Sequence, residues 1–178
     1  DAHSMVAISL IRDNLINVVK SGNDKKARLA MCNASCLAGA AFSNSMVGIV
    51  HSLGHATGGV CHVPHGVAMS IFLPFGLEYN LEKSRDLIAE LLFPIGGAEV
   101  YATTPKEKRA ERAIELIREI RTELNTLCGL PMTLKEAGVD KVKLTDIANT
   151  AINDGSMIYN PVDASYDEAL AILEKAYE

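Results

Sequence analysis

Four of the five histidines in this chain fall within one short stretch, GIVHSLGHATGGVCHVPHG, which runs from Gly48 to Gly66. They are His51, His55, His62 and His65. Histidine is the commonest metal ligand and the side chain best suited to proton transfer near neutral pH. The sequence therefore predicts metal or proton chemistry in this stretch.

The spacing of the histidines narrows that chemistry. His51 and His55 are four residues apart within a predicted helix over 46–57, so they share one face with Cβ atoms about 6 Å apart. His65 follows a Gly-rich turn, and spacing alone makes all three candidate ligands of a zinc or iron ion. Ser52 stands where a zincin motif needs a catalytic glutamate, which excludes that motif. The alternative is a set of hydrogen-bonded histidines in a polar pocket.

The composition indicates a globular, helix-rich chain. Its 178 residues are 48% hydrophobic, 22% charged and 5% aromatic. A net charge of -5 and a pI near 5.6 argue against nucleic-acid or anionic-membrane partners, and no apolar run is long enough to span a bilayer. The spacing of the cysteines does not match a structural zinc site. We therefore expect all of them to be reduced thiols in a cytoplasmic protein. Cys32 and Cys36 are expected to pack in the core.

Helical periodicity and breakers predict an all-α fold with one domain, a single helical bundle of roughly eight helices. The segment 25–41 is rich in small residues, which places it at the centre of the bundle. Capping boxes are expected at Thr104 and Ser165. The predicted helices span 5–20, 25–41, 46–57, 66–73, 81–92, 104–128, 144–153 and 165–177. Gly58-Gly59 is expected to end the third, Pro74 to break or restart the fourth, and 93–103 to form a loop.

A resemblance extends these inferences. The stretch AGAAFSNSMVGIVHSLGHATGGVCHVPHGVAMSIFLPFGLEYN resembles the hallmark segment of the iron-containing (group III) alcohol dehydrogenases. The flanking segments DAHSMVAISLI, MCNASCLAGAAF and NDGSMIYNP agree with it. The VPHG element and the separation of His51 from His65 fit this family better than the glycerol dehydrogenases or dehydroquinate synthases. The resemblance covers essentially 1–178 and implies a dehydroquinate synthase-like C-terminal helical domain.

The resemblance also implies roles for individual residues. His51 and His65 match two ligands of a divalent iron, with zinc as the alternative metal. His55 matches a histidine beside the metal and the nicotinamide that binds substrate or relays a proton, and Phe42 matches an aromatic lining of the substrate pocket. His62 matches no ligand position.

The family's other two ligands, an Asp-x3-His pair, are not found in this sequence, nor is a Gly-rich nucleotide-binding turn. We therefore expect the chain to be the C-terminal part of a longer enzyme, whose N-terminal domain binds most of the NAD or NADP.

The implied reaction is hydride transfer between an alcohol and NAD(P), with the metal acting as a Lewis acid toward the alcohol oxygen. The expected partners are a small alcohol or aldehyde and further copies of the chain in a homo-oligomer. The isolated chain is predicted to be inactive. Two alternatives stay open, a zinc-dependent glycerol dehydrogenase relative and a non-catalytic helical interaction module.

Overall fold

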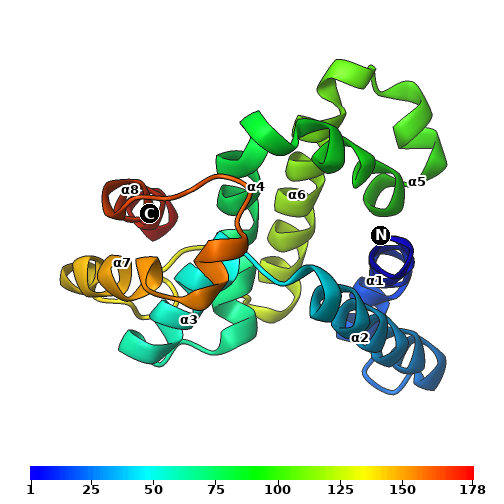
Figure 1. Cartoon of the computed structure of the whole chain (residues 1–178). Coiled ribbons are helices and arrows are strands. Elements are labelled where there is room, and N and C mark those ends of the chain that lie inside the picture. The colour runs from blue at the N-terminus through cyan, green and yellow to red at the C-terminus, as the bar shows by residue number, and fades with distance from the viewer. The chain divides into compact units, whose positions relative to one another are not determined.

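The computed structural model describes all of residues 1–178 and contains only helices (Figure 1). The prediction of an all-α fold with roughly eight helices is confirmed. The elements are α1 Ala2–Lys20, α2 Lys25–Ser45, α3 Ile49–Cys61, α4 His65–Glu90, α5 Leu92–Thr103, η1 Lys106–Lys108, α6 Arg109–Cys128, η2 Lys141–Lys143, α7 Leu144–Ile152, η3 Gly155–Tyr159 and α8 Tyr166–Tyr177, where η denotes a 3₁₀ helix.

The helices group into two compact units. The first consists of Asp1–Ser45 and Arg85–Gly129, and the second of Met46–Ser84 and Leu130–Glu178. The chain therefore passes between the units three times, and the backbone departs from helical geometry at each passage. Met46 has a φ of 62°, Ser84 has φ -119° and ψ 17° within α4, and Gly129 has a φ of 70° after α6. The sequence predicted a break before Met46 and a helix end at Gly129, but it predicted a continuous helix across Ser84.

In the first unit, α1 and α2 form a helical hairpin (Figure 1), and α1 also contacts α5 and α6. Arg12 donates from Nη1 to the carbonyl oxygen of Pro94 at 3.0 Å, which ties α1 to α5. The expectation that α2 would lie at the centre of the bundle is wrong, because only Ala27 and Ala34 are buried along it. The prediction that Cys32 and Cys36 lie in the core is also wrong. Both are exposed, because alanines make up the small buried face of α2.

The second unit has its own apolar core, contributed by α3, α4, α7 and α8. Leu53, Phe72, Ile147 and Leu173 are completely buried in it. Two glycines let helices approach closely. A Cβ on Gly54 of α3 would clash with Met69 of α4, and one on Gly76 of α4 would clash with Val50 of α3. The core thus fixes α3 against α4.

Three predicted helix limits are wrong because packing outweighs local propensity. Helix α3 continues through Gly58-Gly59 and ends where His62 takes left-handed geometry with φ 58°. Helix α4 continues through Pro74, whose side chain is fully buried. The predicted loop 93–103 is the helix α5, although Gly97 interrupts it with a φ of 82°.

The two predicted capping boxes had different outcomes. At Ser165 both hydrogen bonds of the box with Glu168 are present, which confirms that prediction. At Thr104 no box forms, because the side chain donates instead to the carbonyl oxygen of Val100 at 2.7 Å, at the end of α5. Helix α6 begins only at Arg109, after the short η1.

No single helix is both long enough and apolar enough to cross a membrane, although α2 and α3 taken together meet the length and composition criteria.

Candidate functional site

Three of the four clustered histidines lie together in the second unit. His51 and His55 are one turn apart on α3, and His65 is the first residue of α4. Their ring centroids form a triangle with every side 5.6 Å. The rings of His55 and His65 are stacked with an interplanar angle of 25°. The close packing of α3 on α4 at Gly54 brings the two helices near enough for this cluster.

The surroundings of the His51 ring favour its neutral form. Burial lowers the pKa of His51, and positive charge on His55 or His65 would lower it further, while Asp154 opposes the shift. A neutral imidazole is the form that binds a metal ion. His51 is therefore held ready to act as a ligand at neutral pH.

His55 has an acidic partner that the sequence analysis did not identify. Its Nδ1 lies 3.1 Å from Oδ2 of Asp154, the residue that precedes η3. Burial would raise the pKa of Asp154, but hydrogen bonds from Ser156 and His55 outweigh burial and lower it. Asp154 is therefore an ionised carboxylate at neutral pH beside the histidine cluster.

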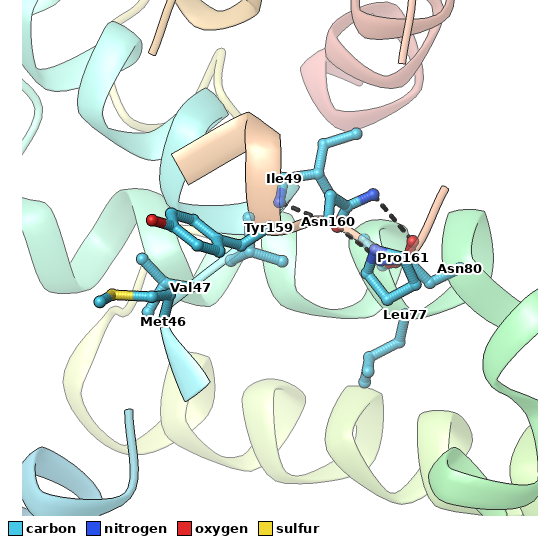
Figure 2. Close-up of a pocket in the computed structure, with 11 residues that line it drawn as sticks. Met46, Val47, Ile49, Leu77, Asn80, Tyr159, Asn160 and Pro161 are labelled. Atoms are coloured by element: carbon cyan, nitrogen blue, oxygen red, sulfur yellow. Dashed lines mark hydrogen bonds between the residues drawn. The ribbon is translucent and has the colours of Figure 1, made fainter. Parts of the chain in front are cut away.

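The start of α3 is held by Asn160, which is buried at the end of η3. Its Oδ1 accepts hydrogen bonds from the backbone N–H of Ile49 at 3.1 Å and from Nδ2 of Asn80 at 3.0 Å. Its Nδ2 donates to Asn80 Oδ1 at 2.8 Å and to the carbonyl oxygen of Val162 at 2.7 Å. Figure 2 shows Asn160 between Ile49 and Asn80. This network fixes the helix that carries His51 and His55.

A shallow pocket of about 250 Å³ lies beside this network. Met46, Val47, Leu77 and Tyr159 are among the residues that line it (Figure 2), and no histidine does. The two amide side chains in its wall, Asn80 and Asn160, already bond to each other. We therefore assign the pocket to the packing around the start of α3 and not to the histidine chemistry.

The remaining predicted residues stand apart from the cluster. His62 is exposed in the turn between α3 and α4 and takes no part in the ring triangle, and its assignment as a non-ligand stays a prediction. Phe42 belongs to the first unit, where its side chain is 51% exposed, and its role in a substrate pocket stays a prediction. No three His, Cys, Asp or Glu side chains are arranged to hold a metal ion. The alternative of a complete three-histidine site is therefore not supported.

Sequence reasoning missed Asp154 and Asn160 as parts of the site. Both lie in the quoted segment NDGSMIYNP, far from the histidines along the chain. An Asp before a Gly and an Asn before a Pro are common turn residues. From the sequence alone, Asp154 and Asn160 are therefore interpreted as parts of turns. The only signal in the sequence was a polar residue on each side of the segment Gly155–Tyr159.

Comparison with known proteins identifies the family. Residues 1–177 match the sequence profile of the C-terminal region of the Fe-containing alcohol dehydrogenase family. The chain belongs to the Fe-containing alcohol dehydrogenase family.

Two curated relatives illustrate the relationship. The chain is 38% identical over 181 residues to 1,3-propanediol dehydrogenase from Klebsiella pneumoniae, covering 99% of this chain and 44% of that protein. It is 36% identical over 180 residues to alcohol dehydrogenase 4 from Saccharomyces cerevisiae, covering 100% of this chain and 44% of the yeast protein. The chain thus spans less than half the length of these relatives.

A solved structure agrees with the sequence relationship. The crystal structure of a 1,3-propanediol oxidoreductase superposes with a TM-score of 0.91 at 34% identity, covering 99% of this chain and 45% of that one. The helical fold is therefore that of the C-terminal region of this family.

Proposed function

We propose that the chain forms the helical, metal-binding part of an NAD(P)-dependent alcohol dehydrogenase that interconverts alcohols and aldehydes. The observation that carries the proposal is the triangle of His51, His55 and His65, formed in a chain of this family. A nucleotide-binding domain would be supplied by sequence preceding residue 1. This division into two domains is supported by the length of the relatives, because the chain covers only 44% of each of the two relatives compared above.

The donor chemistry of the cluster fits part of a metal site. We propose His51 and His65 as two imidazole ligands of a divalent iron, with zinc as the alternative, since imidazole nitrogen suits both metals. The lowered pKa of His51 supports its ligand role. A bound divalent metal would polarise the alcohol oxygen as a Lewis acid. The remaining ligands would come from outside residues 1–178.

The side chain proposed to move the proton is His55. It is more exposed than His51, with 41% of its side chain accessible, so a substrate hydroxyl can approach it. Its Nδ1 is engaged by Asp154, which leaves Nε2 as the atom that can accept the hydroxyl proton. A bound nicotinamide would supply the hydride acceptor for the carbinol carbon, and the protein would position the two reactants.

Small aliphatic alcohols and diols are the proposed substrates. Relatives named for their substrates include a 1,3-propanediol dehydrogenase, an NADPH-dependent butanol dehydrogenase and an NAD-dependent methanol dehydrogenase. The names of these relatives include both forms of the nicotinamide cofactor, so we propose NAD(P) as a class.

The proposal is tested on a longer protein that includes the preceding domain. We expect one iron or zinc ion per chain and NAD(P)-linked oxidation of 1,3-propanediol or butanol, both lost in His51→Ala. The matched control is His62→Ala, because His62 lies in the same stretch but outside the triangle. A longer protein that binds no metal, or whose activity survives His51→Ala unchanged, contradicts the proposal.

A further inference from the structure

The carboxylate of Asp154 is held at both of its oxygens. Oδ2 lies 3.1 Å from Nδ1 of His55 on α3, and Oδ1 accepts a hydrogen bond from the backbone N–H of Ser156 at 2.7 Å. The second bond caps η3 and fixes the orientation of the carboxylate. Asp154 therefore presents one oxygen to the histidine cluster while its other oxygen caps η3.

The geometry determines which nitrogen of His55 carries its hydrogen. An ionised carboxylate can only accept hydrogen bonds. The Nδ1 atom of His55 must therefore be the donor, which leaves the lone pair of the neutral ring on Nε2. The stacked ring of His65 restrains the same imidazole from its side. Both the tautomer and the orientation of His55 follow from its neighbours.

We propose that Asp154 is a positioning residue that holds His55 in the tautomer with hydrogen on Nδ1 and directs Nε2 toward the substrate hydroxyl. The catalytic consequence rests on the proposed function. In alcohol oxidation the hydroxyl proton passes to Nε2 of His55, the carbinol hydrogen leaves with its electron pair to NAD(P)+, and the Nε2 proton later returns to water. Asp154 keeps the Nδ1 hydrogen in place and does not itself take up a proton.

A second aspartate separates this role from helix capping. Asp140 caps η2 in the same unit, with its Oδ1 accepting from the backbone N–H of Val142 at 3.2 Å. No hydrogen bond or ion pair joins Asp140 to a histidine. A substitution there removes the charge of a 3₁₀ cap without touching the histidine cluster, which makes it the matched control.

The first test measures the tautomer directly in the 178-residue chain. Two-bond proton–nitrogen correlation spectra of the histidine rings, recorded at about pH 8.5 where imidazole is ordinarily neutral, should show hydrogen on Nδ1 of His55. In Asp154→Asn the amide can still cap η3 through its oxygen, but its NH₂ group faces Nδ1 as a donor. We expect the hydrogen of His55 to move to Nε2 in this variant.

Asp140→Asn should leave the His55 spectrum unchanged, and exposed His62 serves as an internal reference in every sample. An unmodified chain with hydrogen on Nε2 of His55 overturns the proposal, even if a variant fails to fold. An unchanged tautomer in folded Asp154→Asn also overturns it.

The second test measures turnover in the longer enzyme. Asp154→Asn should lower kcat by about 10- to 100-fold, as expected when a residue that orients a reacting histidine is lost, with metal content and KM retained. Asp140→Asn should keep full kcat. An active enzyme in which Asp154→Asn turns over normally overturns this inference while the proposed function stands. A wild-type enzyme without activity contradicts the proposed function, and the tautomer measurement then still decides the role of Asp154.

Discussion

At the scale of single residues, His51 and His65 are the two proposed ligands within the chain, and two imidazoles make a weak site. No three donor side chains are arranged around an ion, so we expect the 178-residue chain to bind Zn²⁺ weakly. Calorimetric titration should show this binding lost in His51→Ala or His65→Ala. It should be retained in His62→Ala, since His62 lies outside the ring triangle. Tight binding that survives both ligand substitutions would assign the metal to other residues.

Tyr79 gives a prediction for alkaline pH. Burial, followed by the negative charge of Glu168, raises the pKa of Tyr79 from 10.0 to about 12. Its hydroxyl donates to the carbonyl oxygen of Asp163 at 2.7 Å. Because the folded pKa is raised, this stabilisation is complete below pH 10 and is lost as the pH rises toward about 12. A spectrophotometric titration should show a late-ionising phenol that is absent in Tyr79→Phe. A Tyr79→Phe titration identical to that of the wild type would refute the assignment.

At the scale of elements, the contact between α3 and α4 should respond differently to three added methyl groups. Gly76→Ala places a Cβ against Val50 and Ile49, whose branched side chains are stiff, so we expect a loss of about 1–3 kcal/mol. Gly54→Ala meets the flexible end of Met69 and should cost less. Gly59→Ala meets nothing and should stabilise α3 by roughly 0.5–1 kcal/mol. Urea unfolding measures all three, and a stabilising Gly76→Ala would refute this account of the contact.

Asn160 joins three elements, and its removal should be costly. Asn160→Ala leaves the backbone N–H of Ile49 and the side chain of Asn80 without their partner. Each unsatisfied buried group costs about 1–3 kcal/mol, so we expect a loss of roughly 2–4 kcal/mol. Asn153→Ala is the control, because that exposed side chain bonds only to the carbonyl oxygen of Asn149 in its own helix. Equal unfolding free energies for the two variants, measured in urea, would rule out a structural role for the network.

The same elements show how far the sequence could predict the structure. The capping box at Ser165 and the stop at Gly129 were predicted because they depend on neighbouring residues only. The helix through Gly58-Gly59 and α5 were not, since burial within the units overrides the local preference of glycine and proline there. For the site, the spacing of His51, His55 and His65 predicted their proximity. Asp154 could not be placed, because its contact with His55 joins residues far apart in the sequence.

At the scale of the whole molecule, each unit is discontinuous in sequence, and the chain crosses between them at Met46, Ser84 and Gly129. A single segment cannot therefore be removed without breaking a unit. The histidine triangle, Asp154 and the Asn160 network all belong to the second unit. The proposed chemistry thus depends on Leu130–Glu178 as much as on the histidine-bearing helices.

The proposed division of labour predicts that the 178-residue chain alone does not oxidise alcohols. It spans 44% of the length of its curated relatives, and no three side chains in it are arranged to hold a metal ion. Hydride transfer needs a bound nicotinamide positioned against the substrate. We expect no NAD(P)-linked reduction or oxidation above background with 1,3-propanediol, even after addition of Fe²⁺ or Zn²⁺. Circular dichroism must show the helical fold intact in the same sample. Metal-dependent turnover by this chain, abolished by His51→Ala, would show that the chain itself completes the site and would reject the division proposed here.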